Sequence, residues 1–251
     1  EQDIRRMGGI WKKIPVTYAV MWIGSLALAG VPFFAGYFSK DFVLEAAYAS
    51  HSAVGKYAFA CGMLAAFLTA FYSWRLIILT FHGKPRADHH TMEHVHESPA
   101  VMLIPLLALS VGALFSGAAL YELFVGHHWD QFWNGAIVNA PHNHIMHHVH
   151  EVPSWVPLAP TVVGLSGIAL AYILYMAAPS IPGKIASTFR GVYLFLLNKW
   201  YFDELYDAIF VKPAQSLARV LWKTGDARII DGMPNGTAAM AVEVANGTVR
   251  L

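Results

Sequence analysis

Four stretches of this chain are apolar over the length that a helix needs to cross a lipid bilayer. Such a helix takes about 20 predominantly apolar residues. The stretches cover residues 14–38, 57–81, 99–121 and 156–178. Charged residues make up only 13% of the chain, whereas a soluble domain carries about 25%. The sequence therefore predicts an all-α fold, a polytopic bundle of transmembrane helices.

The first apolar stretch has a helical pattern that continues to residue 50, which is too long for one straight span. Gly30, Pro32 and Gly36 lie inside it. Proline removes a backbone donor and clashes with the preceding turn, so a helix kinks or breaks there. We expect residues 14–50 to form two half-helices joined by an unwound stretch. In transporters, breaks of this kind lie at ion sites.

Lysine and arginine are distributed unevenly among the segments that connect the spans. They gather before the first span, between the second and third and after the fourth, whereas the loop over residues 122–157 has none. Because cytoplasmic loops are enriched in these residues, the cytoplasmic segments are predicted to be 1–13, 83–98 and 179–251. Residues 51–56 and 122–155 are predicted to face the other side.

The sequence after the fourth span interleaves apolar and charged residues. Three- and four-residue spacings over residues 179–223 predict an amphipathic surface helix that is too charged to cross the bilayer. Glycines and Pro234 predict a loop over residues 224–251. The chain begins without an initiator methionine and ends without a polar tail, so we expect it to be a fragment.

The strongest candidates for chemistry are Lys40 and Asp41, which directly follow the predicted break. Ionisable groups in membrane segments usually face the protein interior and mark ion pathways. A buried lysine is readily pushed toward its neutral form, so it can carry a proton. Asp41 points about 100° away around an α-helix, so it need not pair with Lys40 and could bond a neighbouring helix. The alternative is that both residues mark the water interface.

Two further ionisable residues are weaker candidates for the same path. Glu45 lies one turn after Asp41 and either extends the path or reaches the opposite headgroup region. Arg75 lies within the second span and stays charged, so it cannot relay protons. It could fix a carboxylate, form a static ion pair or extend to the headgroups.

Histidines cluster in the two longer loops. Imidazole binds transition metals, but no cysteine joins the clusters and no regular spacing frames them, so we predict no metal site. These side chains titrate near neutrality and could buffer protons at a channel mouth. The histidines are His89, His90, His94 and His96 in one loop, and His127, His128, His142, His144, His147, His148 and His150 in the other.

No phosphate loop, dinucleotide fingerprint, nucleophile triad or cysteine cluster is present in the sequence. The net charge of +1 gives no indication of a nucleic-acid partner. Any redox centre of a parent complex is therefore expected in other chains.

Three stretches resemble the antiporter-like membrane subunits of respiratory complex I, the NADH–quinone oxidoreductase, and most of all its distal, L-type, proteobacterial form. The first stretch runs from Ile14 through Pro32-Phe33-Phe34-Ala35-Gly36 to Phe38-Ser39-Lys40-Asp41. The second comprises Ser73-Trp74-Arg75 and Thr80-Phe81-His82-Gly83. The most specific stretch is Trp200-Tyr201-Phe202-Asp203-Glu204-Leu205-Tyr206-Asp207, followed by Phe210-Val211-Lys212-Pro213.

The resemblance implies a multi-pass protein of the bacterial inner membrane that translocates protons. Its implied partners are other membrane-arm subunits and the lipid bilayer. It implies that Lys40 hands protons toward the periplasmic side, and that residues from about Ile185 begin a lateral helix that braces neighbouring subunits. NADH, FMN, iron–sulfur clusters and quinone are expected to bind in other subunits. The family's central lysine, its paired glutamate and its final membrane helix have no match here, so this chain alone is not expected to pump.

Two rival functions remain open at this point. One is a subunit of a multi-subunit cation/proton antiporter, which shares the fold and the broken helices. The other is a structural tether, in which the lateral helix clamps the membrane arm and Lys40 is a static cation.

Overall fold

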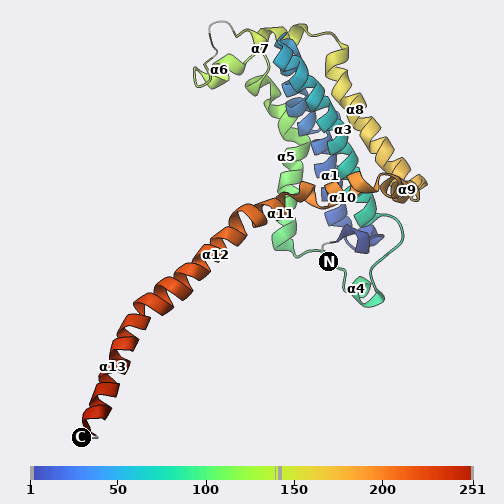
Figure 1. Cartoon of the computed structure of the whole chain (residues 1–251). Coiled ribbons are helices and arrows are strands. Elements are labelled where there is room, and N and C mark those ends of the chain that lie inside the picture. Colours follow the sequence, from blue (N-terminus) through green and yellow to red (C-terminus); the bar gives the residue numbers. More distant parts are fainter. Residues whose placement is uncertain (1–2, 139, 141–142, 250–251) are drawn as a thin grey trace. The chain divides into compact units, whose positions relative to one another are not determined.

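The computed structural model describes residues 3–138, 140 and 143–249 of the chain, and throughout these residues every regular element is helical (Figure 1). The prediction of an all-α fold is confirmed. Contacts divide the chain into one unit over residues 1–183 and a second over residues 184–251. Each unit is described by itself.

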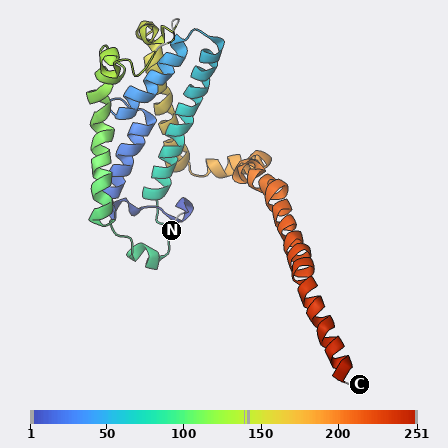
Figure 2. The ribbon, with the colours of Figure 1, turned by 90° about the vertical axis from the view of Figure 1, so that its left-hand side faces the viewer.

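The long helices of the first unit run side by side as a bundle (Figures 1 and 2). Within the described part of the chain, three helices are long and apolar enough to cross a membrane: α3 (Ala53–Phe81), α5 (Ala100–Phe124) and α8 (Trp155–Tyr172) with its π-helical extension Ile173–Ala177. They correspond to the second, third and fourth predicted spans. The short helices of the connecting segments are α4 (His89–Glu93), α6 (Trp129–Trp133), α7 (Ile145–His148) and the 3₁₀ turns Ile4–Arg6, Ile10–Lys12 and Val149–Glu151.

The first predicted span is broken, as the sequence indicated. Helix α1 (Pro15–Ala29) ends at Gly30, and the chain becomes helical again in the π-helical turn η3 (Tyr37–Asp41), which leads into α2 (Phe42–Ala49). Gly30 has a φ of 73°, a conformation that glycine adopts without a steric penalty. The Gly30 N–H donates to the Ala27 carbonyl and the Val31 N–H to the Leu26 carbonyl, both at 3.1 Å. This pair of bonds is the Schellman motif that ends many helices.

The core of the bundle lies where α1, α3 and α8 meet. Ala70 and Ala171 are fully buried and Ala29 is 2% exposed. Small residues let helix backbones approach closely, which is how helices associate in lipid. Trp74 and Ile78 fill the remaining space of this cluster. The close packing fixes the end of α1 against its neighbours.

Helix α1 receives its N-terminal cap from a distant loop. The Glu97 carboxylate accepts hydrogen bonds from the Val16 N–H at 2.9 Å and the Thr17 N–H at 3.1 Å, and also from the Thr17 hydroxyl. These donors belong to the first turn of α1, whose N–H groups have no partner within the helix. Burial by itself would raise the pKa of Glu97, but these hydrogen bonds outweigh it and hold the pKa below its usual range.

Replacing Glu97 with alanine should destabilise the bundle by about 0.5–2 kcal/mol, the usual cost of losing a helix cap. Because the pKa of Glu97 is lower in the folded state, its contribution is fully present above the ordinary value of 4.5 and is lost as the pH falls below that value. Thermal unfolding of the purified protein in detergent at pH 7 and at pH 4 would measure both effects. Equal losses at both pH values would contradict the assignment.

The second unit is helical over most of its length. Its α-helices are α10 (Arg190–Leu197), α11 (Phe202–Tyr206), α12 (Lys212–Val220) and α13 (Gly232–Val249). π-Helical stretches cover Asp207–Val211 and Leu221–Ile230. The preceding helix α9 (Ile181–Thr188) contains the boundary between the two units. The predicted continuous helix over residues 179–223 is interrupted, because Lys199, Trp200 and Tyr201 all have positive φ angles.

The prediction of a loop over residues 224–251 is wrong for most of that segment. Residues 232–249 form α13. Pro234 lies in the first turn, where its missing N–H removes no helical hydrogen bond. The alanines, Met240 and Glu243 that follow are good helix formers. Glycine and proline therefore do not prevent a helix in this segment.

Candidate functional site

The side chain of Lys40 lies at the broken end of α1. Its Nζ donates a hydrogen bond to the Ala29 carbonyl oxygen at 2.8 Å. This carbonyl belongs to the last turn of α1, which carries the partial negative charge of the helix dipole. A Cβ added to Gly30 would collide with the Lys40 amine, so the glycine also makes room for it. The ammonium is thus held at the unwound stretch by a backbone acceptor, with its side chain 26% exposed.

Asp41 is the most deeply buried charged residue of the site. Its side chain is 3% exposed, and Oδ1 lies 3.4 Å from Lys40 Nζ. Neither carboxylate oxygen has a hydrogen-bond partner among the described residues. Of the two possibilities that the sequence left open for Asp41, the structure has the contact with Lys40 rather than a bond to a neighbouring helix. Both residues lie in the π-helical turn η3.

Glu45 and Tyr121 extend the polar groups beyond Asp41. Glu45 is half-buried on α2, and its carboxylate lies near enough to interact electrostatically with Asp41 and with the Tyr121 hydroxyl. Tyr121 lies on α5, and its ring centroid is 6.3 Å from that of Phe42. Nothing in the spacing of the sequence pointed to Tyr121, because α5 is separated from the broken helix by the whole of α3.

Arg75 contacts a tyrosine. Its Nε donates to the Tyr175 hydroxyl at 3.0 Å, and the guanidinium lies 5.5 Å from the centroid of the Tyr175 ring. This pair links α3 to the π-helical extension of α8. Arg75 thus contacts Tyr175 rather than the Lys40–Asp41 pair, so the structure does not join it to that site.

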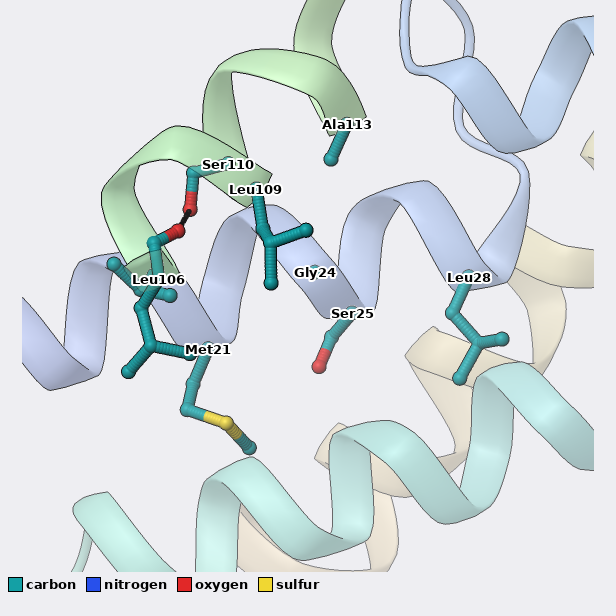
Figure 3. A pocket seen from close by; sticks show the side chains of 9 residues that line it. Met21, Gly24, Ser25, Leu28, Leu106, Leu109, Ser110 and Ala113 are labelled. Carbon is teal, nitrogen blue, oxygen red and sulfur yellow. Dashed lines mark hydrogen bonds between the residues drawn. The ribbon is translucent and has the colours of Figure 1, made fainter. Parts of the chain in front are cut away.

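One pocket between α1 and α5 contains no titratable side chain (Figure 3). It has a volume of about 380 Å³ and is lined mostly by apolar side chains such as Met21, Leu28 and Leu109. The hydroxyl of Ser110 donates to the Leu106 carbonyl at 2.9 Å. This pocket therefore offers no group that could exchange a proton with Lys40.

A second pocket adjoins the π-helical turn itself. It has a volume of about 220 Å³ and lies between η3 and α5. Ser39, Ser116 and Tyr121 contribute hydroxyl groups to its lining. The space is large enough for several waters, although most of the side chains that line it are apolar.

The loop histidines form pairs of rings. The centroids of His127 and His150 are 5.6 Å apart with the rings nearly parallel, and those of His90 and His94 are 4.6 Å apart. Among the residues that the structure describes, no three His, Cys, Asp or Glu side chains converge as metal ligands would. His142 lies outside the described residues.

The chain is similar to membrane subunits of known complexes. A family model described as "NADH:quinone oxidoreductase/Mrp antiporter, TM" matches residues 1–69, a segment that includes the broken helix. NADH-quinone oxidoreductase subunit L of Rhodobacter capsulatus is 41% identical over 95% of this chain, and that of Neisseria meningitidis serogroup B is 36% identical over 98%. NADH-ubiquinone oxidoreductase chain 5 of Cryptococcus neoformans is 35% identical over 92% of the chain.

The matched part of these relatives is less than half of each. The chain spans 42% of the Rhodobacter protein, 40% of the Neisseria protein and 35% of the Cryptococcus protein. The similarity covers both units, including the stretch from Trp200 to Pro213 that carried the most specific resemblance.

Proposed function

Because this chain belongs to the family of antiporter-like membrane subunits that includes subunit L of NADH-quinone oxidoreductase, we propose that it forms part of a proton-translocating subunit. The subunit would lie in the inner membrane of a bacterium, among other membrane subunits of the same complex. Electron transfer from NADH to quinone, with its FMN and iron–sulfur clusters, would take place in other chains and drive the proton movement.

The observation that carries this proposal is the position of the Lys40 ammonium. It is held between the Ala29 carbonyl and the buried Asp41 carboxylate, at the point where the membrane helix is unwound. Both acceptors stabilise the protonated form, whereas desolvation favours the neutral form. A change in the electric field of neighbouring charges can then shift the balance, so that Lys40 takes up a proton and releases it.

Asp41 would accept the proton that Lys40 releases. Among the described residues, Lys40 is the cation that approaches the Asp41 carboxylate, and neither carboxylate oxygen accepts a hydrogen bond. Asp41 can therefore receive a proton without first breaking another bond. Glu45, one turn further along α2, would continue the path. Arg75 has a smaller place in the proposal, as a fixed charge bound to Tyr175 that positions α3 against α8.

The Lys40→Ala substitution in the whole complex tests the proposal. The variant should oxidise NADH in uncoupled membranes but should build up little or no proton gradient, as followed by a pH-sensitive dye in proteoliposomes. Repeating the assay with and without sodium separates proton pumping from cation/proton antiport. Normal proton accumulation by an assembled Lys40→Ala complex would refute the proposal.

A structural tether is the second candidate function. The described helices of the second unit expose large apolar side chains, including Leu217, Val220 and Trp222, each about 60% exposed and therefore available to neighbouring subunits. A tether alone predicts that Lys40→Ala leaves pumping intact, whereas shortening the chain before α12 prevents assembly. The chain has both functions if Lys40→Ala abolishes pumping and the shortened chain prevents assembly.

A further inference from the structure

We propose that Glu122, His127 and His150 form the outer end of the proton path, where protons from Asp41 leave the protein. This inference deepens the proposed function and rests on it. It assigns a role to the histidine-rich loop, which the site at Lys40 does not use.

The histidine-rich loop is fixed onto the second half of the broken helix. The turn Val149–Glu151 and helix α7 pack against α2. Val149 is 2% exposed and forms a buried cluster with Phe42 and Ala49. The ring of His150 lies 6.5 Å from that of Phe42, the residue next to Asp41. The loop is thus held directly beyond the buried carboxylate.

His127 lies between the other two side chains of the proposed outlet. The rings of His127 and His150 stack with their centroids 5.6 Å apart and their planes within 9°. His127 Nδ1 lies 3.7 Å from Glu122 Oε2, and the backbone N–H of His127 donates to the same oxygen at 3.3 Å. The His127 side chain is 84% exposed and that of Glu122 is 58% exposed. Both side chains are therefore open to solvent in this chain.

Tyr121 connects the buried carboxylates to this surface cluster. It is the neighbour of Glu122 on α5, and its hydroxyl interacts electrostatically with Glu45 and with Glu122. The pocket of about 220 Å³ that it lines also contains Ser39, next to Lys40, and continues to Val125. The pocket therefore extends along α5 from the broken helix toward the start of the histidine-rich loop, with hydroxyl-bearing residues at intervals in its lining.

The chemistry of imidazole suits the release of protons. One ring nitrogen can accept a proton while the other gives one up, and the exchange takes place near neutral pH. The pair would thus take a proton from Asp41, by way of Glu45 and Tyr121 or water, and pass it to the medium without any change in oxidation state.

Other titratable groups surround the outlet. His128 Nδ1 lies 4.0 Å from Glu122 Oε2, and His148 Nδ1 lies 3.4 Å from Glu151 Oε2. The ring of His51 lies 6.0 Å from that of His148. The inference therefore needs controls that remove histidines from the same side of the bundle without touching the stacked pair.

The test uses the whole complex in proteoliposomes, with its NADH-oxidising side facing the medium and a weakly buffered lumen. His127→Gln combined with His150→Gln should slow lumenal acidification severalfold. This loss is smaller than the roughly hundredfold loss of rate that follows removal of a positioned general base. Imidazole trapped in the lumen should restore the proton flux, calculated from the dye signal and the buffering capacity of each preparation, because a mobile base replaces the missing one. A trapped pH dye measures the acidification.

Two double variants serve as matched controls. His144→Gln with His148→Gln removes a ring pair from the same loop, and His90→Gln with His94→Gln removes a pair from the other loop; both should acidify the lumen at the wild-type rate. A wild-type rate in the His127/His150 variant, or a loss that imidazole fails to restore, would overturn the inference. If Lys40→Ala abolishes pumping while the His127/His150 variant is normal, only the outlet is wrong; if Lys40→Ala pumps normally, the proposed function itself fails.

Discussion

The Lys40→Arg variant is expected to assemble, to keep its positive charge beside Asp41 and to lose almost all proton translocation through this subunit. Arginine has a pKa above about 12 and stays protonated in proteins. At pH 7 only about one arginine in 10⁵ would be neutral, so the side chain can hold the ion pair but cannot release its proton. The expected result is a complex that oxidises NADH but accumulates few protons, measured as the number of protons moved per NADH oxidised.

A comparison with Lys40→Met separates charge from proton transfer. Methionine keeps most of the length and apolar stem of lysine but leaves the buried Asp41 without its cation. Lys40→Met should therefore lose both pumping and some stability, whereas Lys40→Arg should lose pumping alone. If the arginine variant pumps like the wild type, Lys40 acts as a static charge and the tether becomes the better account.

The Gly36→Ala substitution should damage the site through geometry alone. Gly36 has an ordinary helical φ of −63°, so the backbone conformation itself would accept alanine. An added Cβ, however, would collide with the Ala27 carbonyl oxygen and lie 2.8 Å from the carbonyl carbon. Because backbone atoms must move to relieve this contact, we expect a loss of about 3 kcal/mol, at the upper end of the usual cost of overpacking. The π-helical turn would be pushed away from α1, and Lys40 would lose the Ala29 carbonyl.

Gly24→Ala, in α1 on the other side of the break, is the matched control. A Cβ at Gly24 meets no atom within 4 Å, and alanine favours helix over glycine by about 1 kcal/mol. The amount of assembled complex on a native gel, together with its proton pumping, measures both variants. Wild-type assembly and pumping by Gly36→Ala would show that the close approach to Ala27 is not required.

The backbone break could be predicted from the sequence because its causes are local. Gly30, Pro32 and Gly36 each act on their own or the preceding turn, and the break falls where they stand. The membrane helices could also be predicted from the sequence, since length and apolarity identify them without any knowledge of their neighbours. Lys40 could be singled out for the same reason, as a cation next to that break.

The partners of the charged residues could not be predicted, because they depend on packing between distant segments. Tyr175 lies 100 positions after Arg75, and Glu97 reaches α1 from a loop 80 positions further along the chain. The contact of Asp41 with Lys40 lies in a π-helical turn, which no residue pattern in this segment indicated. The helix over residues 232–249 could not be predicted because a helix accepts proline most readily in its first turn, and the sequence does not indicate where this helix begins.

The acceptor of the Lys40 hydrogen bond is a main-chain oxygen, and this limits what genetics can reveal about the site. Every amino acid placed at position 29 brings the same carbonyl, so saturation mutagenesis would report only the packing demands of a buried alanine there. Suppressors of a weakened Lys40 variant should instead arise at Gly30 or Asp41, which control how the amine approaches that oxygen. One of the two acceptors of the Lys40 ammonium thus cannot be changed by amino-acid replacement. Only a change to the backbone, such as an ester in place of the peptide bond after Ala29, would weaken this hydrogen bond.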